Sequence, residues 1–439
     1  MDHNKNFLTE TSVWKLIAKL SIPTVIITLV MAIYNMADIF FIGKTGNADF
    51  VNAISVCMPV FTIVQAFGTL IGAGGCTAIS IALGRQENHR TKSISAFCFW
   101  LSLALGVVLT LFINIFADSF VTLLGATASY KPYAITYLKI IGSGSTVMLF
   151  SNAFVNILRA DGSVKESMAA NLSGTFLNII LDPILILGFN MGVAGAAVAT
   201  VLGNALSLII ILKVYKKKSD ILSFNVKHLS FRTDNSVKIL ALGMPLAIGT
   251  LFMSFSYMIM NNLLKAYDAN AQGAFGICRT IMLLSTMIQM GICMGVQPAI
   301  SYNFGAKNMQ RVKEIILKTG IVTASFGGIL SLVVISFRRT ILSAFINNQS
   351  VLSYADRMIV GCLCTAAVYG VFQISVTALQ ALEKPMQSTF ITIMRQGIIL
   401  IPAMLILNTI LKFDGLIYSF AVTDIIAALC GLILLKKQL

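Results

Sequence analysis

Long apolar segments with few charges follow one another from one end of the chain to the other. Each is long enough to cross about 30 Å of hydrocarbon as a helix of roughly 20 residues. The strands of a membrane β-barrel are shorter and alternate polar with apolar residues, which these segments do not. The sequence therefore predicts an all-α polytopic membrane protein with twelve transmembrane helices. The predicted spans are residues 18–42, 53–82, 94–116, 133–157, 168–188, 193–214, 239–263, 272–300, 315–336, 356–380, 388–408 and 415–435.

The composition agrees with this prediction and excludes a soluble domain. The 439 residues are 57% hydrophobic and only 11% charged, whereas the surface of a soluble protein is wetted by many more charges. The formal net charge is +15, and most of the 32 lysines and arginines lie in segments on the same side as the N-terminus. This bias is typical of cytoplasmic loops, so we expect both termini in the cytoplasm. We interpret the basic cluster at 213–238 as a topology signal near anionic headgroups rather than a nucleic-acid site.

Other chemistry finds little support in the sequence. The first 20 residues lack the apolar core and cleavage site of a secretory signal, so we expect no cleavable signal peptide. We interpret the eight scattered cysteines as buried hydrophobes rather than ligands or disulfides. The three histidines, His3, His89 and His228, fall in predicted cytoplasmic segments, and no phosphate-binding glycine loop with a lysine occurs. We therefore expect no enzymatic activity, no ATP site and no cofactor.

The two halves of the chain share motifs at a nearly constant separation along the sequence. The matched segments are 21–23 with 243–245, 84–92 with 305–313, and 158–167 with 379–388. An even number of spans in each half gives both halves the same orientation in the membrane. The sequence therefore predicts two pseudo-symmetric six-helix bundles, a plan that alternating access uses directly. The expected division is an N-lobe at 1–215, a cytoplasmic linker at 216–236 and a C-lobe at 237–439.

Two aspartates lie inside predicted spans of the first half, with no lysine or arginine near them in sequence. Asp38 follows Tyr34 by four residues, and Asp182 follows Asn178 by four, so each pair shares a helix face. A carboxylate is costly in hydrocarbon and usually faces an internal cavity, where it binds a proton, a cation or a partner. Further side-chain oxygens in the same half come from Tyr137, Asn152, Asn156 and Thr200.

This all-oxygen group suits a hard monovalent cation or a shared proton, and the sequence leaves both open. Each aspartate also has a structural alternative. Asp38 can be a hydrogen-bonded structural residue, and Asp182 can belong to a helix kink with Pro183.

The second half has intramembrane charges of both signs. Arg395 in span eleven and Asp424 in span twelve are expected to pair, because an unpaired buried charge is costly. We interpret the pair as structural, with a role in substrate gating as the alternative. Arg279 in span eight has no evident partner in the sequence.

Several segments together resemble the multidrug and toxic compound extrusion (MATE) family, over roughly residues 10–435. The resemblance depends on residues 34–43, 84–85, 156–162, 178–186, 192–197 and 297–305. Within that family the chain looks most like the MepA-like and DinF-like members. The resemblance implies a V-shaped pair of six-helix lobes that exports organic cations in exchange for protons or sodium ions.

The resemblance also implies roles for particular residues. It places the coupling ion at the positions of Asp38, Asn178, Asp182 and Thr200, and the substrate cavity at those of Tyr34, Tyr137 and Asn156. We expect Asn152 to line the same cavity. The acidic residues that the NorM-like branch uses in spans seven and ten are absent, so no C-lobe cation site is expected. We expect small organic cations and membrane lipids as partners, no nucleic acid, and a monomer in the cell membrane.

The main alternative is a flippase for lipid-linked precursors from the same superfamily. Such a protein handles anionic pyrophosphate, for which we expect several arginines facing the cavity, and only Arg279 and Arg395 are candidates. A membrane enzyme would need a histidine or a clustered acidic motif at the membrane face. A channel has less need of the repeated architecture.

Overall fold

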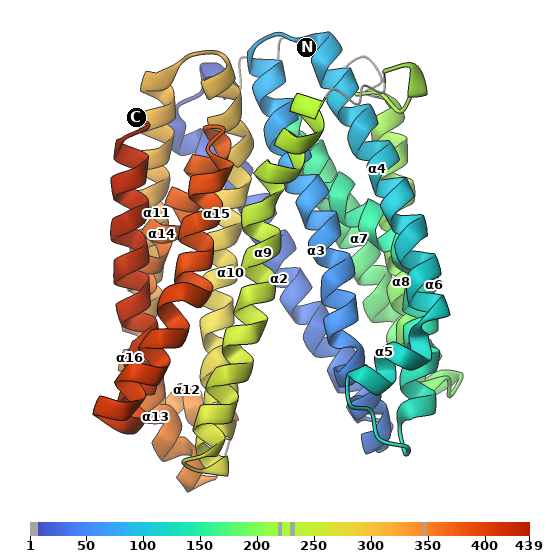
Figure 1. Cartoon of the computed structure of the whole chain (residues 1–439), viewed down its shortest axis with the longest axis vertical. Helices are drawn as coiled ribbons and strands as arrows, with labels where there is room; N and C mark the ends of the chain where they lie inside the picture. The colour runs from blue at the N-terminus through green and yellow to red at the C-terminus, as the bar shows by residue number, and fades with distance from the viewer. Residues whose placement is uncertain (1–7, 218–221, 229–232, 346–347) are drawn as a thin grey trace. The chain divides into compact units, whose positions relative to one another are not determined.

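The computed structural model describes residues 8–217, 222–228, 233–345 and 348–439, and almost all of them are helical (Figure 1). A helix satisfies its backbone polar groups within itself, which a segment in hydrocarbon requires. The α-helices of the first half are α2 (Val13–Gly43), α3 (Ala48–Gly84), α4 (Asn88–Ile115), α5 (Ala117–Leu123), α6 (Lys131–Ile157), α7 (Val164–Asp182) and α8 (Gly192–Lys217). Those of the second half are α9 (Thr233–Lys265), α10 (Ala269–Gly305), α11 (Met309–Ser336), α12 (Arg338–Phe345), α13 (Gln349–Leu363), α14 (Ala366–Ala381), α15 (Pro385–Ile393) and α16 (Leu400–Lys436).

Four short helical segments interrupt or join these helices. Two are 3₁₀ helices, η1 (Leu158–Asp161) and η3 (Val226–His228). The other two are π-helical, η2 (Pro183–Gly188) and η4 (Met394–Ile399). The π-helical segments widen the helix locally, a feature that is frequent at functional sites.

The described residues contain ten helical segments that are long and apolar enough to cross a membrane. The helix pair α13 and α14, bent by 44°, brings that number to eleven. One of the ten, Pro385–Lys436, covers both predicted spans 388–408 and 415–435. Lys412, with a φ of 52°, interrupts the helix between these two spans. Each of the twelve predicted spans therefore falls on helix, and the prediction of an all-α polytopic membrane protein is confirmed.

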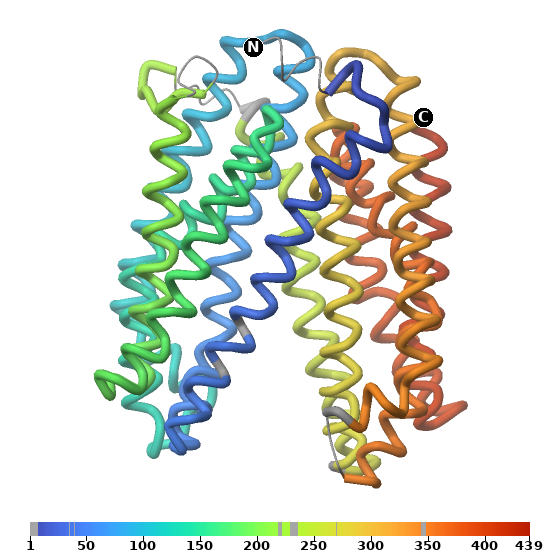
Figure 2. The backbone as a smooth tube through the Cα atoms, turned by 180° about the vertical axis from the view of Figure 1, so that it is seen from behind, coloured from blue at the N-terminus to red at the C-terminus, as the bar shows by residue number. Residues whose placement is uncertain are grey.

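The chain forms two compact units (Figure 2). The N-unit is Ile26–Gly243, and the C-unit combines the described part of Met1–Val25 with Met244–Leu439. The division thus falls inside α2 and α9, close to Pro23 and Pro245, rather than in the linker at 216–236. Of that linker, residues 218–221 and 229–232 lie outside the described chain.

The two units repeat the same local contacts at the offset found in the sequence. The N-cap residues Asn47 and Asp268 each accept a hydrogen bond of 2.9 Å from the backbone N–H two residues later. Two further side-chain bonds to carbonyls recur, Cys57 to Ala134 with Cys278 to Ala355, and Ser167 to Val155 with Ser388 to Val376. All three cases share one and the same offset, which fixes the register between the halves.

Glycines of neighbouring helices allow close packing against the N-terminal parts of α2 and α9. A Cβ at Gly295 of α10 would lie 2.6 Å from the carbonyl oxygen of Leu20, in the part of α2 that belongs to the C-unit. Gly74 of α3 makes the matching approach to the carbonyl of Ile239, in the part of α9 that belongs to the N-unit. Larger side chains would overpack both contacts.

Candidate functional site

Two proline-containing segments position the aspartates of the N-unit. Asp38 lies in the last third of α2, beyond Pro23. Asp182 is the last residue of α7, because Pro183 has no N–H to donate to the preceding turn and the chain continues as the π-helical η2. The side chain of Asp182 is fully buried.

The carboxyl groups of Asp38 and Asp182 lie close enough to interact electrostatically, and Asp38 also interacts with the hydroxyl of Tyr34. That hydroxyl shares a hydrogen bond of 3.3 Å with the hydroxyl of Thr200 from α8. Asn178, one turn before Asp182, donates from its amide to the same Thr200 oxygen at 3.4 Å. The structure therefore brings together polar side chains from α2, α7 and α8, and we call these five residues the aspartate cluster.

The buried phenol of Tyr137 on α6 adjoins the aspartate cluster, since it interacts electrostatically with both Asp38 and Asp182. Sequence spacing could pair residues within α2 and within α7. It could not show that two helices so far apart in the chain meet at their aspartates, because that depends on tertiary packing.

The aspartate cluster contains more buried acceptors than the surrounding protein satisfies. The Oδ1 atoms of Asp38 and Asn178 and both carboxyl oxygens of Asp182 have no hydrogen-bond partner among the described residues. No lysine or arginine of the described chain lies within ion-pair distance of either aspartate. Such buried oxygens are stabilised by a proton or by a cation, and hard oxygen ligands of this kind suit a monovalent ion.

Asn152 and Asn156 make their hydrogen bonds elsewhere. The amide of Asn152 donates to the Gln65 carbonyl at 2.9 Å and to the Thr69 hydroxyl at 3.2 Å, so it joins α6 to α3. Asn156 donates to the carbonyl of Asn152 at 2.8 Å and accepts from the buried guanidinium of Arg159. Gln65 and Thr69 have no distinguishing signal in the sequence, apart from their spacing around the small Gly68.

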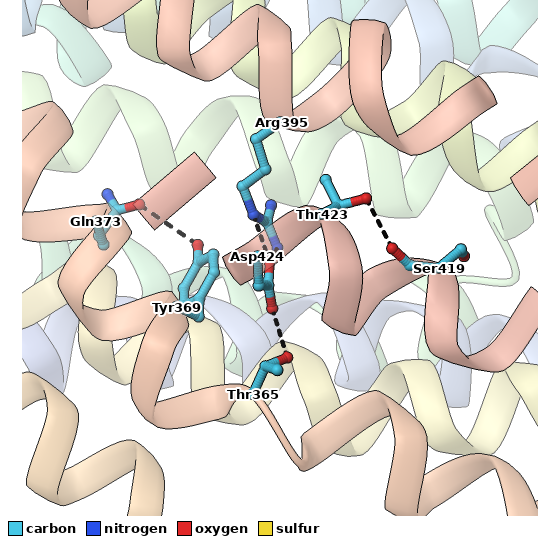
Figure 3. Close-up of polar contacts among 7 residues, drawn as sticks. All are labelled: Thr365, Tyr369, Gln373, Arg395, Ser419, Thr423 and Asp424. Carbon is cyan, nitrogen blue, oxygen red and sulfur yellow. Dashed lines mark hydrogen bonds and ion pairs between the residues drawn. The ribbon is translucent and has the colours of Figure 1, made fainter. Parts of the chain in front are cut away.

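In the C-unit, Arg395 and Asp424 form an ion pair (Figure 3). The Nε and Nη2 atoms of Arg395 both lie 2.7 Å from one carboxyl oxygen of Asp424, and the Thr365 hydroxyl donates to the other at 2.9 Å. The guanidinium also lies over the rings of Tyr369 and Phe372, at 4.6 and 5.1 Å from their centroids. This charge pair is therefore neutralised within its own unit.

The comparison with protein families gives one match in each half of the chain. The model of the MatE family matches residues 23–184 and again residues 245–406. The two matched segments are equal in length, and they are separated along the chain by nearly the same number of residues as the repeated motifs.

Full-length relatives are similar to this chain. The multidrug export protein MepA of Staphylococcus aureus (strain NCTC 8325 / PS 47) is 30% identical over 437 residues, which cover 99% of this chain and 96% of the relative. MepA of Staphylococcus haemolyticus (strain JCSC1435) is 29% identical, with 97% and 94% covered.

Solved structures share the fold. A crystal structure of MATE in complex with MaL6 has a TM-score of 0.93 at 22% identity and covers 99% of this chain and 97% of its own. The outward-facing conformation of a multidrug resistance MATE family transporter has a TM-score of 0.91 at 22% identity, with 98% and 97% covered.

Proposed function

The chain belongs to the MatE family of multidrug and toxic compound extrusion transporters, and on that premise we propose that it exports small organic cations by exchange for protons or sodium ions. The observation that supports this most is the aspartate cluster, where two interacting carboxyl groups have no basic partner in the described chain. A multi-pass membrane transporter of this family is not an enzyme, so the carboxylates serve binding rather than catalysis.

Exchange requires that the two cargoes compete. In the proposed cycle, the coupling ion is held by Asp38 and Asp182, with oxygens of Asn178 and Thr200 completing its surroundings. An organic cation is attracted by the same negative charge, so it binds well only after the coupling ion has left. This reciprocal loss of affinity is the differential interaction that coupling demands.

The direction of transport follows from the proposed topology. With both termini in the cytoplasm, as the distribution of lysines and arginines predicts, substrate enters from the cytoplasm or the inner leaflet and leaves on the opposite side. The repeat within one chain supplies both bundles, so we propose that a monomer is sufficient.

The test is ethidium efflux from proteoliposomes, with proton and sodium gradients imposed separately. We expect wild-type protein to drive efflux with one of the gradients and Asp38→Asn to lose that gradient dependence. The matched control is Asp118→Asn, because Asp118 on α5 has a side chain 69% exposed and forms an ion pair with Lys131. This variant should retain wild-type efflux.

Efflux that is equal in Asp38→Asn and in wild type would overturn the role of the aspartate cluster. Absence of efflux under both gradients would instead favour the flippase for lipid-linked precursors. That alternative has weaker support, because Arg395 is neutralised by Asp424 and a pyrophosphate needs more than one free guanidinium.

A further inference from the structure

Residues 222–228, a described part of the predicted cytoplasmic linker, are docked on the N-unit. The backbone N–H of Ser223 donates to the hydroxyl of Ser95 on α4 at 2.9 Å. The carbonyl of Ser223 accepts from the hydroxyls of Ser95 and of Tyr215 on α8, each at 3.3 Å. Because two helices hold this short segment through their side chains, we call residues 222–228 the linker clasp.

The side chain of Phe224 in the linker clasp packs among aromatic rings of the N-unit. Its ring is stacked on that of Tyr215 with 3.9 Å between the centroids, and its centroid lies 4.3 Å from that of Phe99 on α4. The indole of Trp100 donates to the Phe224 carbonyl at 3.1 Å. These groups are all neutral, so the docking of the linker clasp depends on apolar burial and hydrogen bonds.

Two of the three histidines of the chain meet at the end of the linker clasp. The ring centroid of His228, its last residue, lies 6.4 Å from that of His89 on the first turn of α4. The Nδ1 atom of His228 lies 2.7 Å from the Ser223 hydroxyl, which accepts from the N–H of Asn225 at 3.1 Å. The hydroxyl proton of Ser223 has no other acceptor among the described residues, so the neutral imidazole accepts it at Nδ1.

The surface around the two imidazoles has an excess of positive charge. The titratable and charged groups of the elements that meet there are Arg85 at the end of α3, Glu87, Arg90 and Lys92 at the start of α4, Tyr215, Lys216 and Lys217 of α8, and Lys227 of η3. Glu87 is the single carboxylate among these groups, and it forms an ion pair of 3.0 Å with Arg90. A proton on either histidine therefore gains no free counter-charge from them.

We propose that the linker clasp is sensitive to protons: it is docked when His89 and His228 are neutral and is released when both are protonated. Histidine is the side chain that ordinarily changes charge between about pH 5 and 8. Two positive charges 6.4 Å apart repel each other, which weakens docking about threefold even in the dielectric of water. A protonated His228 also accepts no hydrogen bond from Ser223, and this loss weakens docking about fivefold more.

The sign of the effect follows from these two losses. Protonation opposes docking, so docking is strongest at the alkaline end of the range and weakens as the pH falls from about 8 to about 5. The distribution of lysines and arginines predicts that the linker is cytoplasmic, so the pH that acts on the linker clasp is that of the cytoplasm. None of these residues belongs to the aspartate cluster, and the inference is therefore independent of the proposed exchange.

The test is hydrogen exchange at the linker clasp, followed by mass spectrometry on the purified full chain in detergent at about pH 8 and about pH 5.5. The N–H of Ser223 bonds to Ser95, and the N–H of Asn225 bonds to the hydroxyl that His228 holds, so both exchange only after the clasp opens. After correction for the intrinsic effect of pH on exchange, we expect protection to be about tenfold lower at the acidic pH.

Three variants divide the effect among the histidines. His228→Gln removes both the repulsion and the titrating acceptor, so the protection of the linker clasp should become independent of pH. His89→Gln removes the repulsion alone and should leave a change of about fivefold. The matched control is His3→Gln, which removes the remaining histidine of the chain and should keep the full change.

A reference within the same protein separates release of the linker clasp from general loosening. At the N-cap of α13 the N–H of Ser350 donates to Asn348 at 2.9 Å, and no histidine lies in that segment. Its corrected protection should be equal at the two pH values.

The proposal is overturned if the protection of residues 222–228 is the same at both pH values, or if it falls equally in His228→Gln. A parallel fall at the N-cap of α13 also overturns it, because acid then loosens the whole protein. The ethidium efflux test of Asp38 is a separate measurement, so a failure of the linker clasp and a failure of the proposed exchange are distinguishable.

Discussion

Removing the carboxylate of the C-unit ion pair should destabilise the protein more than removing the pair. The side chains of Arg395 and Asp424 are only 11% and 7% exposed, so Asp424→Asn leaves a guanidinium buried without a counter-charge. Breaking a buried pair in this way costs about 3–5 kcal/mol. The rings of Tyr369 and Phe372 lie against the guanidinium in the wild type and in the variant, so they do not reduce this cost. We therefore expect a loss of about 3–5 kcal/mol in the free energy of unfolding.

The assay is reversible unfolding in mixed micelles with increasing SDS, followed by tryptophan fluorescence. The double variant Arg395→Met with Asp424→Leu should be more stable than Asp424→Asn, since no charge is then left unpaired. The control is Asp414→Asn, because Asp414 pairs with Arg357 at side-chain exposures of 45% and 59% and should contribute less than about 1 kcal/mol. A loss below about 1 kcal/mol in Asp424→Asn, or a double variant less stable than it, would refute the reasoning.

Three further predictions use the same preparations. Gly295→Val should lower the free energy of unfolding by about 1–3 kcal/mol, because it overpacks the carbonyl of α2; Gly276→Ala on the same helix meets nothing within 4 Å and should be neutral or stabilising in the same SDS titration. Thr200→Val removes the hydroxyl shared by two neighbours and should raise the coupling-ion concentration for half-maximal efflux about fivefold, whereas Thr200→Ser should not. Trp100→Phe deletes the 3.1 Å hydrogen bond to the Phe224 carbonyl, and we expect faster proteolysis of the linker on gels, with unchanged efflux.

Local patterns in the sequence were sufficient for the helices and for the repeat. A long apolar segment in hydrocarbon satisfies its backbone hydrogen bonds by forming an α-helix, so each of the twelve spans could be placed by length and composition alone. The structure adds the N-caps Asn47 and Asp268, which repeat at the same offset. The interruption at Lys412 falls in the segment 409–414 that the sequence predicts between two spans, although a lysine has no local preference for the positive φ found there.

The polar side chains were harder to assign because their partners lie on other helices. Asn152 and Asn156 fit the inventory of oxygens in the first half, yet their hydrogen bonds join α6 to α3 and hold Arg159. Helix rotation decides which face meets which neighbour, and periodicity within one span does not contain that information. The ion pair of Arg395 with Asp424 was easier, because two opposite buried charges have few other ways to be stabilised.

The two halves repeat one fold but have different kinds of side chain, polar in the N-unit and apolar in the C-unit, at related places. The position that the repeat relates to Tyr137 is Met358, which lines a small cavity in the C-unit with other apolar side chains, among them Met260 and Phe420. A carboxylate in that cavity would have no oxygen neighbours to share its proton or ion, so the coupling chemistry we propose belongs to one half only. The other half instead has Arg279, whose guanidinium lies over the ring of Tyr257. Because each bundle forms without the charges of the other, the repeated helix plan itself does not require those charges.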